Sequence, residues 1–215
     1  MATYSSSPSL SSPLAPYTST ATTNPPSNTT ESWQPPPYTS FPPFYTLQPN
    51  LTTLDRQLSL WSSLILSYCT YHRLYKLSLS SPPPNLFTNP TISRSLSPQA
   101  IRKVLDYMSR PENGSRIDWI APASKSEQSS SCWVLWKSLG EWADVVYGWV
   151  EGTGQKGAVL TIYELKEEDA NGGGTGGREW LGMEEGLLRK VLGVLVKRGK
   201  AQVFGEEGGG GVKFF

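Results

Sequence analysis

Apolar side chains recur along this chain in two series that follow the same order of helix and strand patterns. The first series spans residues 55–77, where apolar or aromatic positions return at spacings of three and four. Its members are Leu58, Trp61, Leu64, Ile65, Tyr68, His72 and Tyr75. Such a spacing places side chains on one helix face, so we expect a long helix that ends before the proline run at residues 82–84.

A second helix is predicted where Ser97 precedes Pro98, because serine is a good N-cap and proline fits the first helical position. Its apolar face comprises Ile101, Val104, Leu105 and Met108. Residues 86–92 form a short element before it, with extended character. Two strand-like runs at residues 117–120 and 132–136 follow, joined by a serine-rich loop at 121–131.

The same order then repeats. Ser138 and Glu141 predict a capping box, and the helix they begin is expected to end at Gly152. Its apolar face comprises Trp142, Val145, Val146, Trp149 and Val150. A short segment at 158–165, a helix at 183–198 stopped by Gly199, and strand-like runs at 201–204 and 212–215 complete the second series.

A helical unit closed by a two-stranded hairpin is the outline of a winged helix. We therefore predict an α+β, mostly helical fold of two tandem winged helices, at residues 51–137 and 138–215. Each unit is near the lower size limit for an independent core, so the two should share buried surface. Trp133, Trp136 and Trp142 lie near the junction and suit that role.

The N-terminal residues differ in composition. Residues 1–33 are rich in Ser, Thr and Pro and carry Glu31 as their only charge, so we expect a disordered low-complexity tail. Residues 34–50, QPPPYTSFPPFYTLQPN, contain two Pro-Pro-x-Tyr units. We call this segment the strap. Proline restricts the backbone, so ordering the strap on a partner costs little conformational entropy.

The candidate partner-binding residues of the strap are Pro42, Pro43, Phe44 and Tyr45, with Pro35, Pro36 and Tyr38 as a second, weaker copy. A solvated linker and a WW-domain ligand are the alternatives for one such motif. Two copies beside a folded domain favour docking. On this interpretation the strap packs on a partner, so replacing Phe44 and Tyr45 should leave the chain's own fold nearly unchanged.

Charge and motifs do not point to catalysis. The chain has 19 basic and 18 acidic residues, so it lacks the basic excess that is typical of domains that bind the phosphates of nucleic acids. The single histidine, His72, lies on a predicted apolar helix face, and no cluster of metal ligands occurs. The G-x-G-x-x-G match at 152–157 follows a helix instead of a strand, so we interpret it as a turn and expect no cofactor.

Cys69 and Cys132 are far apart and outside any metal motif, so buried free thiols in a reducing compartment are expected. The sequence shows no secretory signal pattern and no apolar stretch long enough to span a bilayer. We therefore expect a soluble, cytoplasmic protein. A DNA-binding regulator with a WW-ligand tail remains the alternative, because residues 183–200 are mildly basic.

Several blocks resemble the family of small winged-helix subunits of ESCRT-II, over roughly residues 35–215. They are the strap, Arg56-Gln57-Leu58 with Trp61, residues 133–136 running into Glu141-Trp142, Thr161-Ile162-Tyr163-Glu164-Leu165, and Gly211-Val212-Lys213-Phe214-Phe215. The N-terminal extension, the loop 121–131 and the glycine insertion near residue 172 depart from the family pattern.

The resemblance implies a non-enzymatic subunit in multivesicular-body sorting of ubiquitinated membrane cargo. It implies that the strap and first winged helix dock onto the two larger ESCRT-II subunits, with two copies of this chain per complex. The second winged helix would engage an ESCRT-III subunit, but the resemblance assigns no contact residues. As a separate hypothesis, we expect residues 183–200 or the adjoining hairpin to offer this surface, because they belong to the terminal module. Contact with the endosomal membrane would be indirect, and nucleic acid would not be a partner.

Overall fold

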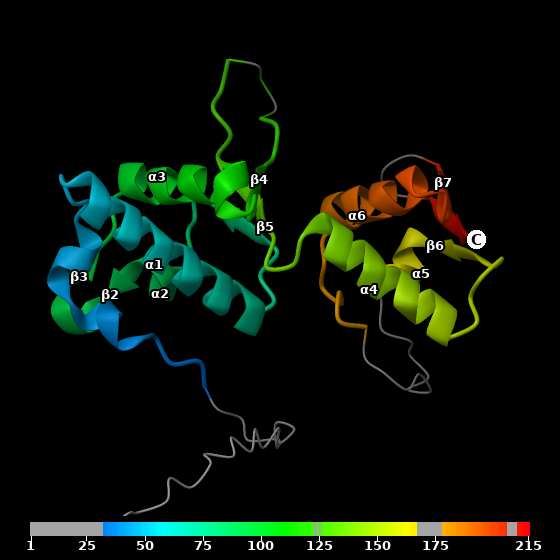
Figure 1. Ribbon diagram of the computed structural model, residues 1–215, viewed down its shortest axis with the longest axis horizontal. Helices are drawn as coiled ribbons and strands as arrows, with labels where there is room; N and C mark the ends of the chain where they lie inside the picture. The colour runs from blue at the N-terminus through cyan, green and yellow to red at the C-terminus, as the bar shows by residue number, and fades with distance from the viewer. Residues whose placement is uncertain (1–31, 123, 125, 167–177, 206–209) are drawn as a thin grey trace, which may run out of the picture. The chain divides into compact units, whose positions relative to one another are not determined.

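The secondary structure repeats one order of elements twice. The computed structural model describes residues 32–122, 124, 126–166, 178–205 and 210–215 (Figure 1). The first series comprises α1 (Leu51–Tyr71), β1 (Lys76–Ser78), α2 (Pro84–Phe87), α3 (Pro98–Ser109), β4 (Ile117–Trp119) and β5 (Ser131–Val134). The second comprises α4 (Leu139–Gly152), β6 (Val159–Thr161), α5 (Ile162–Lys166), α6 (Glu185–Lys197), β7 (Ala201–Phe204) and β8 (Gly211–Phe214).

Each series closes an antiparallel sheet with the same strand order. The first sheet runs β1-β5-β4 and the second runs β6-β8-β7, so in both the first strand of the series pairs with one strand of a C-terminal hairpin. Helix, strand, two helices and hairpin make the winged-helix order, and the predicted α+β class is confirmed. The domain boundary at residue 137 remains a prediction.

The smaller elements lie in the strap, around α2 and after α3. A two-stranded pairing joins β2 (Thr88–Asn89) to β3 (Arg94–Ser95). Single 3-10 turns form η1 (Pro37–Ser40), η2 (Pro42–Tyr45), η3 (Pro90–Ile92) and η4 (Pro111–Asn113). The segment at residues 86–92 thus comprises the end of a helical turn, a short strand and a 3-10 turn. The expected extended character is confined to the short strand, and the two helical turns were not predicted.

The first long helix is shifted from its predicted range of 55–77. It begins earlier because the Asn50 side chain accepts a hydrogen bond from the Thr53 amide at 3.1 Å. It ends at Tyr71 because Arg73 adopts a left-handed φ of 51°. Tyr75 therefore leaves the helix face on which its spacing placed it, and the next three residues form β1, which was not predicted.

Other local predictions are confirmed. The Ser97 hydroxyl accepts from the Ala100 amide at 3.2 Å, and Ser138 and Glu141 form the expected capping box. Gly199 stops α6 at a φ of 68°. The glycine pattern at residues 152–157 is a turn after α4, with Gly154 at a φ of 68°. The predicted tail up to residue 31 and the glycine insertion near residue 172 lie outside the described residues, as does most of the last hairpin turn.

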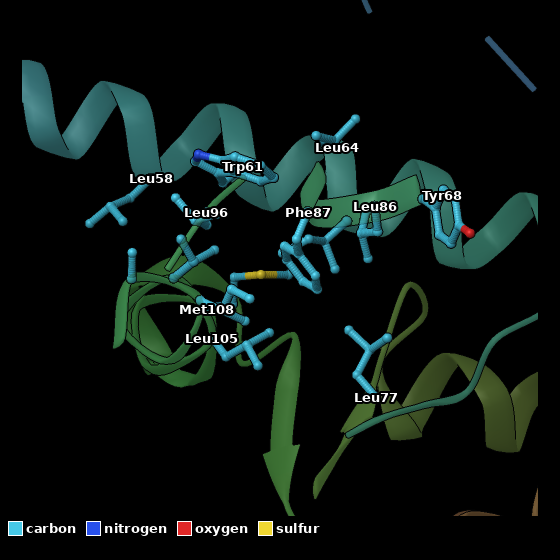
Figure 2. Close-up of a cluster of buried hydrophobic side chains, with 14 of the residues drawn as sticks. Leu58, Trp61, Leu64, Tyr68, Leu77, Leu86, Phe87, Leu96, Leu105 and Met108 are labelled. Carbon is cyan, nitrogen blue, oxygen red and sulfur yellow. The ribbon is translucent and has the colours of Figure 1, made fainter. Parts of the chain in front are cut away.

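The first hydrophobic core lies between α1, α3 and the first sheet (Figure 2). Trp61 and Ile65 of α1 are fully buried, as is Met108 of α3. Each such side chain contributes about 1.5–3 kcal/mol of transfer free energy. Because these positions follow the predicted helix faces, the amphipathic pattern accounts for how α1 meets α3.

Residues at the first sheet also enter the second core. Tyr75, which directly precedes β1, and Trp133 of β5 belong to the cluster that contains α4 and α6. A Cβ on Gly186 of α6 would lie 3.1 Å from the Trp133 ring, so this glycine lets the indole approach the helix. Trp136 meets Trp142 with ring centroids 5.8 Å apart, as expected for tryptophans at the junction.

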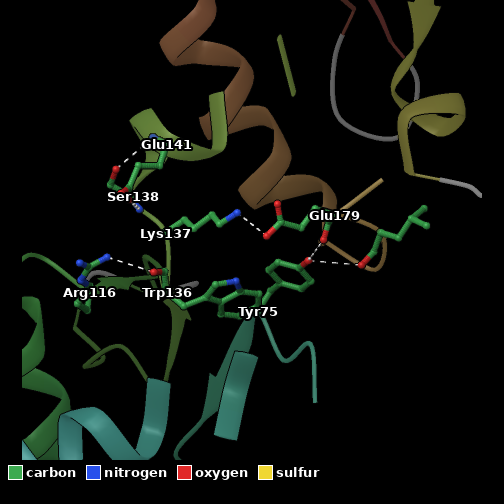
Figure 3. Close-up of polar contacts among 8 residues, drawn as sticks. Tyr75, Arg116, Trp136, Lys137, Ser138, Glu141 and Glu179 are labelled. Atoms are coloured by element: carbon green, nitrogen blue, oxygen red, sulfur yellow. Dashed lines mark hydrogen bonds and ion pairs between the residues drawn. The ribbon is translucent and has the colours of Figure 1, made fainter. Parts of the chain in front are cut away.

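Polar contacts accompany the shared core (Figure 3). The Tyr75 hydroxyl donates to the Glu179 and Leu181 carbonyls at 3.3 and 3.4 Å, and Lys137 pairs with the Glu179 carboxylate. Burial raises the pKa of Tyr75 to about 12. Its hydroxyl therefore stays protonated and available as a donor well above neutral pH.

The two cysteines are free and buried, as predicted. Burial raises the pKa of both thiols from 9.0 to about 12. Between these pH values the folded chain retains protons that the unfolded chain has lost. The free energy of unfolding should therefore be intact below pH 9 and fall as the pH rises toward 12.

We expect the native thiols to react slowly with Ellman's reagent at pH 8 and rapidly in concentrated urea, because burial suppresses the thiolate. Urea midpoints should decrease from pH 8.5 to pH 11. The Cys69→Ala/Cys132→Ala variant should show a shallower decrease, the remainder coming from tyrosines such as Tyr75. Equal thiol reactivity in buffer and in urea would contradict this account.

Candidate partner-binding site

The strap is folded onto the first helix. Each Pro-Pro-x-Tyr unit contains a 3-10 turn that begins at a proline, η1 at Pro37 and η2 at Pro42. Proline fixes φ near the value that such turns require. The Thr39 amide donates to the Pro36 carbonyl at 3.0 Å, and the Thr46 amide donates to the Pro43 carbonyl at 3.1 Å. Local sequence thus sets the path of the strap.

The aromatic rings of the second unit point into the first core. The Phe44 ring stacks on Trp61 with centroids 4.4 Å apart and planes 10° from parallel. Tyr45 meets the same indole edge-on at 5.6 Å, and its hydroxyl donates to the Thr39 carbonyl at 3.1 Å. Only 5% of Phe44 and 7% of Tyr45 are exposed.

This burial corrects one expectation. The strap does not leave Phe44 and Tyr45 to a partner, since both rings belong to the chain's own core. The sequence pattern could not reveal this, because a Pro-Pro-aromatic motif has the same composition whether its ring faces inward or outward. Whether these residues also bind a partner remains a prediction.

Gln57 holds the strap backbone and was not among the predicted site residues. Its amide nitrogen donates to the Phe44 and Thr46 carbonyls at 2.8 and 2.9 Å, and its amide oxygen accepts from the Gln48 amide at 3.2 Å. The Trp61 indole N–H also donates to the Phe44 carbonyl, at 3.1 Å. The sequence could have indicated this role, because Gln57 is a polar residue next to Leu58 and near Trp61 on the apolar helix face.

The first unit packs more loosely. Tyr38 is half-buried against Phe44, with centroids 5.2 Å apart, and its hydroxyl donates to the Leu60 carbonyl at 3.4 Å. Burial raises the pKa of Tyr38 and of Tyr45. Pro35 is exposed and Pro36 is partly buried. If the strap bound a WW domain through the tyrosine of a Pro-Pro-x-Tyr unit, that ring would first have to leave its packing in this chain.

The exposed edge of the strap faces solvent beside an apolar groove. Phe41 is 62% exposed, and Pro42 and Pro43 are also exposed. The groove has a volume of about 450 Å³. Its lining residues are Phe41, Pro43, Phe44, Gln48, Thr53, Arg56, Gln57 and Leu60. We call it the docking groove. The structure thus separates inward anchors from an outward apolar surface.

A second pocket, of about 370 Å³, lies where the start of the strap meets the turn after α2. Trp33, Tyr45 and Asn89 are among its lining residues. The Asn89 amide donates to the Thr39 carbonyl at 2.9 Å, so this side chain braces the strap. The pocket has no charged lining residue.

The described residues contain no cluster of side chains that could hold a metal ion. His72 lies exposed at the end of α1, 4.3 Å from the Tyr68 ring centroid, and not on the buried face that its spacing indicated. No three His, Cys, Asp or Glu side chains cluster in the described parts of the chain. No described helix is long and apolar enough to cross a membrane.

Three basic residues of α6 and its C-terminal end, Lys190, Arg198 and Lys200, have partners within the chain. Lys190 pairs with Asp118, and Arg198 contacts the Asp144 carboxylate at 2.5 Å. The Lys200 ammonium lies 4.0 Å from the Tyr147 ring centroid. These contacts occupy cations that a duplex-binding helix would direct at phosphates, which weakens the DNA-binding alternative.

The sequence and the fold of this chain are similar to those of known proteins. A family model described as "ESCRT-II complex subunit" matches residues 38–184. Vacuolar protein-sorting-associated protein 25 from Danio rerio is 38% identical over 177 residues, which is 82% of this chain and 95% of the relative. The human protein of that name is 35% identical, with 81% of this chain and 93% of the relative covered.

Solved structures are similar as well. The crystal structure of subunit VPS25 of the endosomal trafficking complex ESCRT-II matches with a TM-score of 0.71 and 33% identity, covering 84% of this chain and 98% of that one. A chain in the crystal structure of endosomal ESCRT-II (VPS22/VPS25/VPS36) matches with a TM-score of 0.71 and 32% identity, covering 83% and 98%.

The inward packing of the strap predicts a stability effect. Phe44→Ala should reduce the free energy of unfolding of the isolated chain by about 3–5 kcal/mol, because it leaves a cavity against Trp61. Phe41→Ala is the matched control, because the Phe41 side chain is 62% exposed in the same segment. Its free energy of unfolding should stay within about 0.5 kcal/mol of wild type. Urea unfolding measures both. A wild-type midpoint for Phe44→Ala would mean that the strap is not part of the core.

Proposed function

The chain belongs to the ESCRT-II subunit family, and on that premise we propose that it is a non-catalytic subunit that docks onto the two larger subunits of an ESCRT-II complex. The observation that carries the proposal is the outward edge of the strap. Phe41, Pro42 and Pro43 are exposed beside the docking groove, while Phe44 and Tyr45 anchor the segment to α1.

A pre-folded strap is a favourable docking element. Fixing one residue costs about 1–2 kcal/mol of conformational entropy, and here the 3-10 turns and the Gln57 hydrogen bonds have already ordered the segment. The free energy gained by covering Phe41, Pro42 and Pro43 is then available for association. Pro35, Pro36 and Tyr38 would supply a second, smaller contact beside it.

The partners follow from the family. The similar solved complex contains VPS22 and VPS36 together with VPS25. We assign the corresponding larger subunits to the strap and the first winged helix, with two copies of this chain per complex. The chain would act from the cytoplasm, reach the endosomal membrane through the complex, and serve the sorting of ubiquitinated cargo.

We assign the second winged helix to an ESCRT-III subunit. In its sheet, Val212 points into the core, so the adjacent Gly211 and Lys213 face outward with their cross-strand partners. Exposed apolar side chains at this end of the unit are Val159, Tyr163, Phe204 and Phe215. They support an apolar contact better than Arg198 and Lys200, which already have partners.

The first test is the mass of the complex after co-expression with the two larger subunits, measured by size exclusion with light scattering. We expect a particle with two copies of this chain. Phe41→Ala should reduce incorporation while the melting temperature stays within a few degrees of wild type, because the ring is exposed and the prolines that set the 3-10 turn are retained. A wild-type chain that stays monomeric with those partners would refute the proposal.

A second test separates two faces of the second winged helix. Tyr163→Ala/Phe204→Ala should weaken binding of an ESCRT-III subunit roughly tenfold, about 1.4 kcal/mol, because exposed aromatic residues dominate such contacts. Val196→Ala removes an exposed apolar side chain from α6 and serves as the control. Titration calorimetry measures both. Weakening by Val196→Ala alone would move the contact to the α6 face.

A further inference from the structure

One face of α1 forms a wall of the docking groove. Thr53, Arg56, Gln57 and Leu60 recur at the three- and four-residue spacing that aligns side chains along a helix. The exposed Phe41 and Pro43 of the strap form another wall. The groove therefore combines an apolar surface with one charged residue, Arg56.

The other polar side chains of the groove are engaged inside the chain. The Gln57 amide nitrogen donates to strap carbonyls, and the Gln48 amide nitrogen donates to the Pro43 and Thr46 carbonyls at 3.1 and 2.9 Å. The Thr53 amide and hydroxyl both contact the Asn50 side chain. These bonds leave the guanidinium of Arg56 as the donor group in the groove that a ligand can use.

Arg56 is exposed and makes no hydrogen bond or ion pair with any other residue that the structure describes. The neighbouring carboxylate, Asp55, makes no ion pair with Arg56 in the described part of the chain, because adjacent positions of a helix do not face each other. Its charge acts on Tyr107 of α3, whose pKa is raised by burial first and then by this carboxylate. The positive charge at the groove edge therefore has no ion-pair partner among the described residues.

We propose that the docking groove receives an apolar side chain of a larger ESCRT-II subunit together with a nearby carboxylate, and that Arg56 binds this carboxylate and selects the partner segment. The inference rests on the proposed function. A planar guanidinium can bind a carboxylate through two parallel hydrogen bonds, which gives orientation as well as charge. The apolar walls alone would accept any hydrophobic side chain of suitable size.

The experiment is a calorimetric titration of the full chain into the co-purified pair of larger subunits, at low and at moderate salt. Arg56→Gln should weaken binding about three- to tenfold and flatten its salt dependence, because it removes one charge pair. Arg56→Lys should fall between Gln and wild type, and Arg56→Glu should bind most weakly. Lys103→Gln, an exposed position on α3 outside the groove, is the matched control.

The outcomes of this experiment separate the role of Arg56 from the proposed docking function on which it rests. If Phe41→Ala weakens binding while Arg56→Gln binds like wild type at both salt concentrations, the groove is a docking site but no carboxylate is recognised. If the wild-type chain does not bind the pair at all, the proposed function fails together with the inference. An equal loss for Lys103→Gln would reduce the Arg56 effect to overall charge and overturn its role in selection.

Discussion

The stacking of Phe44 on Trp61 is the contact on which the arrangement of the N-terminal half depends. It buries the ring of a proline-rich segment against the centre of α1, where the indole also touches Tyr45 and Phe87. Once the ring is in place, the Phe44 carbonyl can accept from Gln57 and Trp61. A motif of the kind that usually binds as a free peptide therefore becomes part of a folded surface.

That surface has a consequence for binding. A free Pro-Pro-x-Tyr peptide must lose chain entropy when it binds, whereas this strap has lost it during folding. Its stability and its affinity for a partner are then carried by different residues, with Phe44 and Tyr45 on the inside and Phe41, Pro42 and Pro43 on the outside. Changes on the inside affect both properties, and changes on the outside affect binding alone.

The two winged helices share more than a linker. Tyr75, which directly precedes β1, and Trp133 of β5 belong to the first unit by sequence and to the second core by packing. Gly186 provides the space for the indole, and the pairs Lys76–Glu184 and Lys137–Glu179 add charge contacts. Small cores bury a low fraction of their surface, so a shared aromatic contact supplies burial that each unit lacks by itself.

The sequence by itself determined most of the helix faces, the caps at Ser97 and Ser138 and the stop at Gly199, because these depend on neighbours in the chain. It also determined the family, because several blocks of the sequence resemble it. Only the tertiary structure decided that Arg73 would end α1 and release Tyr75 toward the second core. It also decided which aromatic rings of the strap face inward. Phe41 and Phe44 stand beside similar prolines, and only the position of Trp61 in the fold separates the exposed ring from the buried one.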